Sequence, residues 1–123
     1  MGLQDFVCVR MCVMKFEIDL NAPEVQFALE VIQFASELAC LVRTESSIKS
    51  ILKQDHSPVT LADMGIQAIA GGLLEHYFPE AVLVGEEDAD YLRTTKGSED
   101  LEKITAYVHS FLPQARPERV CQW

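Results

Sequence analysis

The spacing of apolar residues predicts a long helix in the first half of the chain. Asn21 can cap this helix, Pro23 suits its first turn, and Glu24 favours its positive end. After them, apolar residues recur every three or four positions up to about Thr44, which is typical of one broad helical stripe. The residues of this stripe are Val25, Ala28, Leu29, Ile32, Ala35, Leu38, Ala39 and Val42. Residues 46–52 fit either a strand or the tail of the helix.

The pattern then predicts a loop over residues 53–60, followed by a second helix. Thr60, with Asp63 three residues later, fits a helix cap. The face expected to be buried consists of Ile66, Ile69, Ala70, Leu73 and Tyr77. Gly71 and Gly72 lie within this helix and each costs about 1 kcal/mol relative to alanine. We therefore expect close packing of another helix against the two glycines.

A short apolar run over residues 81–84, with two valines and a leucine, predicts a buried strand. It leads directly into an acidic turn, Gly85-Glu86-Glu87-Asp88, where the glycine allows a sharp change of direction. A third helix is expected over residues 98–111. The predicted order is helix, loop, helix, strand, acidic turn and helix.

Composition restricts the class of protein. The chain has 123 residues, of which 49% are hydrophobic and 24% charged, as in one folded domain or part of a larger one. Nineteen acidic and ten basic side chains give a net charge of -9, which argues against binding to nucleic acid or to an anionic membrane. A small phosphorylated substrate is compatible with this negative charge, because bound cations can reverse the local electrostatic field. No apolar run approaches the ~18 residues of a membrane span, so we expect no membrane association.

Residues 1–14 differ from the rest of the chain, because an ordinary domain pattern begins near Met14. We therefore divide the chain into an N-terminal extension over residues 1–14 and a domain over residues 15–123. The alternative is a true N-terminal strand, which would explain the alternating residues Val7, Val9, Met11 and Val13.

The cysteines indicate a reducing compartment. They are Cys8, Cys12, Cys40 and Cys121. None of them forms a C-x-x-C pair, and no histidine lies at zinc-finger spacing. We expect free thiols in a protein of the cytoplasm.

Two segments carry candidate chemistry, residues 53–63 and residues 84–88. Adjacent carboxylates at the end of a strand can hold Mg²⁺, which usually takes one or two carboxylates together with water and substrate phosphate. Acidic runs are more commonly solvated, however, and the second helix needs a cap from the first segment. His56 and Ser57 suggest hydrolase chemistry, but no nucleophile-elbow sequence surrounds the serine.

Taken together, K-x-D-x-S-P-V-T-x-A-D over residues 53–63 and V-G-E-E over residues 84–87 resemble the inositol monophosphatase superfamily. Residues 53–60 are most similar to the 3'(2'),5'-bisphosphate nucleotidases, which remove the 3'-phosphate from adenosine 3',5'-bisphosphate. The resemblance covers about residues 25–90. It implies an α/β fold, the N-terminal part of a layered αβαβα sandwich, and Mg²⁺-dependent phosphomonoester hydrolysis.

The resemblance also implies roles for three carboxylates. Glu86 would be a Mg²⁺ ligand and catalytic residue, and Asp55 would position or activate the attacking water, often with a further Mg²⁺. Glu87 is the weaker candidate for a metal ligand. No residue is assigned to substrate binding, although the resemblance implies a small phosphorylated nucleotide or sugar phosphate as substrate.

Two further family motifs, D-P-x-D-G-T and W-D-x-x-A-G, are absent from this sequence. The resemblance therefore implies an incomplete phosphatase domain over residues 15–123, lacking its C-terminal half and inactive by itself. One alternative is a phosphatase of inositol or sugar phosphates. The other is a non-catalytic fragment that acts as an interaction module and self-associates through an exposed sheet edge.

Overall fold

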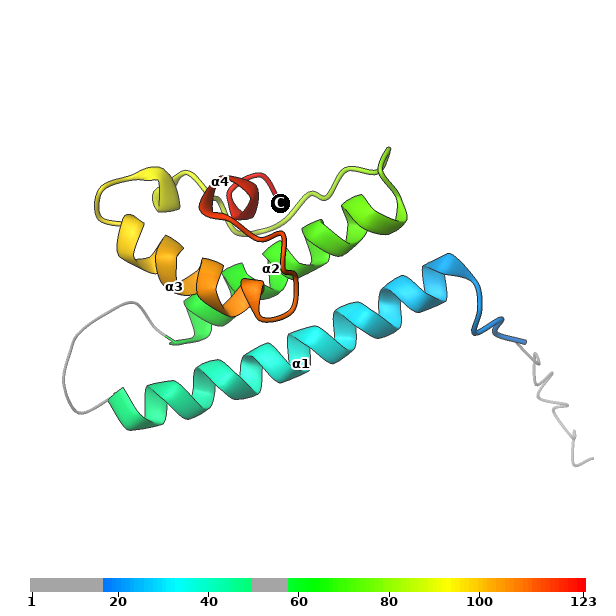
Figure 1. Ribbon diagram of the computed structural model, residues 1–123, viewed down its shortest axis with the longest axis horizontal. Coiled ribbons are helices and arrows are strands. Elements are labelled where there is room, and N and C mark those ends of the chain that lie inside the picture. Colours follow the sequence, from blue (N-terminus) through cyan, green and yellow to red (C-terminus); the bar gives the residue numbers. More distant parts are fainter. Residues whose placement is uncertain (1–16, 50–57) are drawn as a thin grey trace, which may run out of the picture.

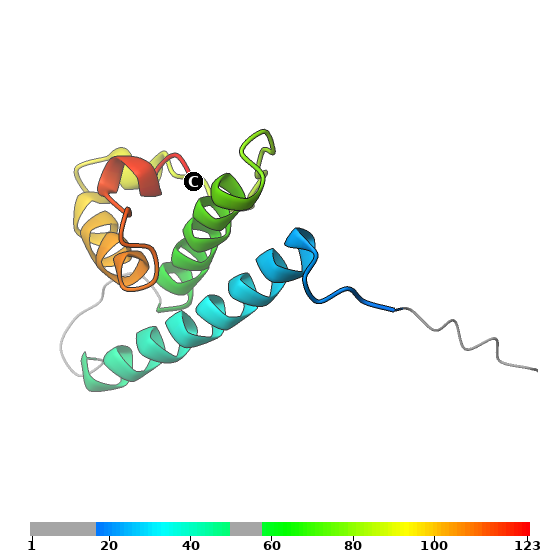
Figure 2. The ribbon, with the colours of Figure 1, turned by 45° about the vertical axis from the view of Figure 1, so that its right-hand side comes forward.

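The computed structural model describes residues 17–49 and 58–123, and these residues form a helical structure (Figure 1). The elements are α1 (Pro23–Lys49), α2 (Pro58–Tyr77), the 3-10 helix η1 (Tyr91–Arg93), α3 (Ser98–His109) and α4 (Pro117–Val120). Helices α1 and α2 lie side by side and run in opposite directions, with α3 and α4 on the other side of α2 (Figures 1 and 2). Helix α2 is thus the centre of the fold.

Helix α1 begins at Pro23, as predicted. The carbonyl oxygen of Ala22 accepts hydrogen bonds from the main-chain N–H groups of Val25 and Gln26, both at 3.0 Å. The helix continues to Lys49, so residues 46–49 are its tail and not a strand. The remaining predictions for residues 1–16 and 50–57, including the boundary near residue 14, lie outside the described residues.

The buried face of α1 differs from the predicted stripe. Leu38 and Val42 are buried as expected, but Leu29 and Ile32 remain 51% and 63% exposed. The residues that pack on the core in their place are Phe27, Val31 and Phe34. Apolar residues lie on more than one side of this helix, whereas its main neighbour α2 covers only one narrow strip.

The same apolar character corrects one sequence-based expectation. Over Pro23–Glu45, α1 is long and apolar enough to cross a membrane, with a mean hydropathy of 1.5. Length and composition are weak evidence on their own, because core helices of soluble proteins meet the same criteria.

Helix α2 starts earlier than predicted. Its first residue is Pro58, so Thr60 lies in the first turn and the predicted Thr60–Asp63 cap is wrong. Proline suits this place because its fixed φ matches the helix and its missing N–H would have no partner there. Ile69 and Leu73 are buried, as the periodicity predicts.

The packing at the two glycines of α2 is close, as expected, but it comes from residues outside the helices and not from another helix. A Cβ atom added at Gly71 would lie 2.7 Å from the Cβ of Trp123. One added at Gly72 would lie 2.6 Å from the Cδ1 of Leu112. Only glycine lets the C-terminal segment pack this closely onto α2 without a shift.

Helix α3 packs against α2 and is also linked to α1. It runs from Ser98 to His109 and so ends two residues before the predicted end at residue 111. Ile104 and Val108 on one face are fully buried. The Tyr107 hydroxyl donates a hydrogen bond to the Glu45 carboxylate at the end of α1. The ring of Phe34 in α1 lies 5.4 Å from the ring of Phe111, just beyond α3, and this contact is a second link between the two helices.

The predicted α/β fold is wrong for this structure. The described residues contain no strand, and residues 81–84 form neither a strand nor part of the core. Val82 and Val84 are 84% and 90% exposed, the opposite of a buried strand. A strand needs a neighbour whose N–H and C=O groups pair with its own. No described residue supplies that neighbour, so the αβαβα sandwich is absent from the described part of the chain and the core there is built from helices alone.

Candidate functional site

The acidic turn is fixed to α2 by one glutamine. The Gln67 side-chain amide donates to the carbonyl oxygen of Glu87 at 3.0 Å. In return, the main-chain N–H of Glu87 donates to Gln67 Oε1 at 3.1 Å. A Cβ atom at Gly85 would overlap with that same oxygen, so only glycine permits this approach. No described glycine has a positive φ, so Gly85 is needed for space and not for the sharp turn that we predicted.

The carboxylates of this turn have different surroundings. Glu86 is exposed and Glu87 is half-buried. The next acidic residues stabilise the start of η1, because Asp88 accepts a 2.8 Å hydrogen bond from the N–H of Asp90. Asp90 in turn forms a 2.8 Å ion pair with Arg93. Unlike Asp88 and Asp90, Glu86 and Glu87 do not use their side chains to stabilise η1.

The described residues do not complete a metal site. No group of three or more histidine, cysteine, aspartate or glutamate side chains gathers anywhere in residues 17–49 and 58–123. Asp55 lies outside the described residues, so its closeness to Glu86 stays a prediction, as do the positions of His56 and Ser57. Glu86 and Glu87 are oxygen ligands of the kind that Mg²⁺ accepts. The donor type fits Mg²⁺, but the described residues do not form a closed site around it.

Recesses near the acidic turn are small. The one beneath it, lined by Gln67, Glu87 and Leu92 among others, holds about 20 Å³. Pockets for small molecules usually measure ~300–1,000 Å³, so a nucleotide does not fit there.

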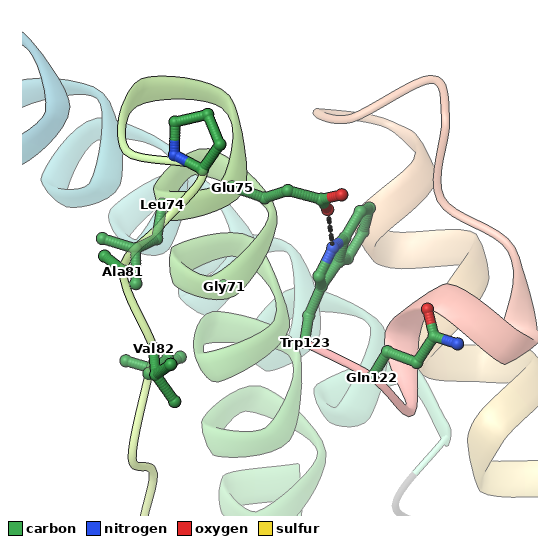
Figure 3. Close-up of a pocket in the computed structure, with 9 residues that line it drawn as sticks. Gly71, Leu74, Glu75, Ala81, Val82, Gln122 and Trp123 are labelled. Atoms are coloured by element: carbon green, nitrogen blue, oxygen red, sulfur yellow. Dashed lines mark hydrogen bonds between the residues drawn. The ribbon is translucent and has the colours of Figure 1, made fainter.

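A larger cavity of about 270 Å³ lies at the other end of residues 79–84 (Figure 3). Leu74 and Glu75 of α2, Ala81 to Leu83, Gln122 and Trp123 line it. Figure 3 shows the side chains of Ala81 and Val82 on one side of α2 and that of Trp123 on the other.

Glu75 holds the C-terminal residue against this cavity. Its Oε2 accepts hydrogen bonds from the Trp123 indole at 2.6 Å and from Arg119 at 2.7 Å. The Arg119 guanidinium also lies over the Trp123 ring, 5.1 Å from its centroid. The indole hydrogen bond, with help from the Arg119 charge, lowers the pKa of Glu75. Sequence reasoning missed this cluster, because Glu75 lies 44 positions before Arg119 and 48 before Trp123, and no local pattern connects it to them.

Comparison with known proteins supports the resemblance seen in the motifs. The 3'(2'),5'-bisphosphate nucleotidase of Schizosaccharomyces pombe is 40% identical over 75 residues, which cover 57% of this chain and 21% of that protein. The 3',5'-bisphosphate nucleotidase AHL of Arabidopsis thaliana is 32% identical over 107 residues, covering 80% of this chain and 28% of that protein. A 3'(2'),5'-bisphosphate nucleotidase of Emericella nidulans is 37% identical over 65 residues, covering 53% of this chain and 18% of that protein. No family model and no solved structure matches the chain.

These relatives are named as nucleotidases, which are hydrolases of the phosphatase type. The matched part of the chain resembles the 3'(2'),5'-bisphosphate nucleotidases. It spans only 18% to 28% of the length of the curated relatives it matches.

Proposed function

We propose that this chain is a segment of a Mg²⁺-dependent phosphomonoesterase that removes the 3'-phosphate from adenosine 3',5'-bisphosphate. The observation that carries the proposal is its 32% to 40% identity to relatives named as bisphosphate nucleotidases in three organisms. The two sequence motifs over residues 53–63 and 84–87 support the same substrate class.

In this proposal the acidic turn contributes the metal-binding carboxylates. Glu86 is exposed, and the two hydrogen bonds between Gln67 and Glu87 restrict the main chain beside it. Glu86 would therefore hold Mg²⁺ from a fixed turn, with Glu87 as the weaker candidate and Asp55 orienting the attacking water. When bound, Mg²⁺ supplies charge neutralisation at the phosphoryl oxygens and a lower pKa for water.

We also propose that the 123-residue chain is inactive by itself. It covers at most 28% of the three relatives compared with it, and its described residues gather no cluster of three metal-binding side chains. Misplacing a catalytic group by only ~1 Å can cost about a hundredfold in rate. The D-P-x-D-G-T and W-D-x-x-A-G motifs are absent from this sequence, so the expected loss is larger.

The test is a chimera in which this chain replaces the aligned segment of the Schizosaccharomyces pombe enzyme. We expect Mg²⁺-dependent phosphate release from adenosine 3',5'-bisphosphate, and a loss of about a hundredfold or more on Glu86→Gln. Glu80→Gln is the matched control, because Glu80 is also exposed and precedes the same apolar run. Loss on Ser57→Ala but not on Glu86→Gln would contradict the metal mechanism. Preference for an inositol phosphate would favour the alternative substrate.

A reducing, cytoplasmic location is part of the proposal. Cys40 and Cys121 are free thiols in the structure. Burial raises the pKa of the Cys121 thiol, which keeps it protonated and less reactive. Free, unreactive thiols are typical of proteins in reducing compartments.

A second candidate function is a non-catalytic interaction module. The observation that favours it is the exposure of Val82 and Val84, which leaves apolar surface open to a partner.

A further inference from the structure

Gln67 of α2 contacts the main chain on both sides of Glu86. Its Nε2 donates to the carbonyl oxygen of Glu87 at 3.0 Å, and its Oε1 accepts from the Glu87 N–H at 3.1 Å. On the other side of Glu86, a Cβ atom added at Gly85 would lie 2.6 Å from the same Nε2 and would overlap with Oε1. Glu86 therefore lies between two residues that both meet one side chain.

The surroundings of the two glutamates show the result of these contacts. Glu86 is exposed, whereas Glu87 is half-buried and lines the small recess beneath the turn together with Gln67. Because both main-chain groups of Glu87 are bonded to one side chain, a rotation of the main chain at this point breaks two hydrogen bonds at once. The Gln67 amide thus favours the arrangement in which Glu86 is the carboxylate presented to solvent.

The base of this contact is rigid. Gln67 lies in the middle of α2, and the next two residues, Ala68 and Ile69, are 2% and 0% exposed. Helix α2 packs against both α1 and α3, so its main chain cannot shift without disturbing the core. A side chain on such an element positions its partner more accurately than a side chain on a loop does.

The contact also leaves the charge of the turn intact. Gln67 is neutral, and the sequence has no lysine or arginine between Pro79 and Asp90. A lysine or arginine in place of Gln67 could also reach the turn, but its positive charge would pair with the glutamates that are expected to hold a cation. An amide holds the main chain without competing for the carboxylates.

We propose that Gln67 is a positioning residue that sets the affinity of the acidic turn for Mg²⁺ without touching the metal. This inference rests on the proposed function, in which Glu86 is a Mg²⁺ ligand. Residues that orient metal ligands from behind typically change metal affinity or activity by about 10- to 100-fold when they are replaced. Here the orienting bonds act on the main chain beside the ligand.

Gly85 and Gln67 act as a pair in this proposal. No described glycine has a positive φ, so the main chain at Gly85 accepts an alanine without strain. Among the described atoms, the Gln67 amide is what a Cβ at Gly85 meets most closely. Gly85→Ala should therefore weaken Mg²⁺ binding by displacing Gln67, and only while Gln67 is present.

The first test is a Mg²⁺ titration of the chimera with the Schizosaccharomyces pombe enzyme. Gln67→Met keeps the length of the side chain and removes both hydrogen bonds. We expect the Mg²⁺ concentration for half-maximal activity to rise about tenfold, and kcat at saturating Mg²⁺ to stay within about twofold. Calorimetric titration with Mg²⁺ alone should show the same weakening. A purely structural role would lower the melting temperature without this shift in Mg²⁺ affinity.

Gln33→Met is the matched control, because Gln33 is a helical glutamine whose Nε2 donates to Glu37 at 3.1 Å, on α1 and not at the turn. It should leave Mg²⁺ affinity within about twofold. Loss of activity on Glu86→Gln together with unchanged Mg²⁺ affinity on Gln67→Met overturns this inference and leaves the proposed function standing. Activity that needs neither Mg²⁺ nor Glu86 overturns both.

A double-mutant cycle tests the pairing with Gly85. We expect Gly85→Ala alone to weaken Mg²⁺ affinity about tenfold. In a Gln67→Ala background the obstruction is gone, so Gly85→Ala should add less than about a twofold loss. If the two losses multiply, Gly85 acts independently of Gln67 and the proposal is wrong.

The last test uses the 123-residue chain without metal. Nuclear magnetic resonance relaxation should give order parameters of about 0.85 for the N–H groups of Glu86 and Glu87, and values below about 0.6 on Gln67→Met. The order parameter of Ile104 in the core should not change, and circular dichroism checks that the helices persist. Order parameters at Glu86 and Glu87 that are the same in both chains overturn the proposal.

Discussion

Replacing Gly72 by alanine tests the packing of the C-terminal segment on α2. The added Cβ atom would lie 2.6 Å from the Cδ1 of Leu112 and 3.3 Å from two ring atoms of Trp123. Carbon atoms in favourable contact lie ~3.5–4.0 Å apart, so Leu112 must move by about 1 Å. Leu112 is buried, at 5% exposure, and has no free path into solvent.

Two opposing effects set the expected size of the change. Overpacking in a core costs about 1–3 kcal/mol. Exchange of glycine for alanine inside a helix returns about 1 kcal/mol. Gly72→Ala should therefore lower the free energy of unfolding by about 0–2 kcal/mol. In a Leu112→Ala background the overlap with Leu112 is gone and only the 3.3 Å contacts with Trp123 remain, so Gly72→Ala should raise the free energy of unfolding by up to about 1 kcal/mol.

The assay is a double-mutant cycle measured by urea unfolding and far-ultraviolet circular dichroism. We expect a coupling energy of about 1–3 kcal/mol between Gly72→Ala and Leu112→Ala. Gly65→Ala is the control, because its Cβ would lie 3.1 Å from the side chain of Leu38 and would not meet Leu112. If Gly72→Ala has the same effect in both backgrounds, within about 0.5 kcal/mol, the close contact is not present in solution.

Three further predictions concern hydrogen bonds. Burial and the Glu45 carboxylate raise the pKa of Tyr107 to about 12. The stabilising contribution of this hydroxyl is therefore present below about pH 10 and is lost as pH rises toward the folded-state pKa. Tyr107→Phe should flatten the decrease in melting temperature at alkaline pH. An unchanged alkaline profile would contradict this prediction. Because the pKa of Glu75 is lowered in the folded state, its carboxylate contributes stability above the unfolded-state pKa of ~4.3. This contribution is lost as pH falls through the folded-state pKa. Glu75→Gln should remove this acid dependence of the melting temperature, and a steeper loss of melting temperature in acid would refute the prediction. Gln67→Leu removes both hydrogen bonds to the Glu87 main chain; the Glu87 amide should exchange faster with unchanged helix content, and equal exchange would show that the turn is held otherwise.

The helices were predictable because their signals are local. Proline at Pro23, the periodic apolar residues and the glycine pair of α2 all act within a few turns of the chain. The buried stripe of α1 was not predictable to the same degree. Leu29 and Ile32 have the spacing of core residues yet remain exposed, because the position of α2 decides which stripe is covered.

The strand prediction was wrong because a strand depends on residues far away in the sequence. The apolar run over residues 81–84 has a composition that suits burial, but burial requires a paired neighbour. The candidate site likewise depends on contacts between residues far apart in the sequence. The sequence indicated Glu86 and Glu87 through a local motif, whereas the Gln67 hydrogen bonds and the Glu75–Trp123 contact bring together distant residues with no shared pattern.

The placement of Trp123 makes the molecule its own optical reporter. The chain has a single tryptophan, so its fluorescence comes from one place. That indole donates to Glu75 and lies beneath the Arg119 guanidinium, beside the cavity that residues 81–83 help to line. Unfolding at the junction of α2 and α4 releases the ring to water and should shift its emission to longer wavelength. The folding of this junction can therefore be followed without an added label.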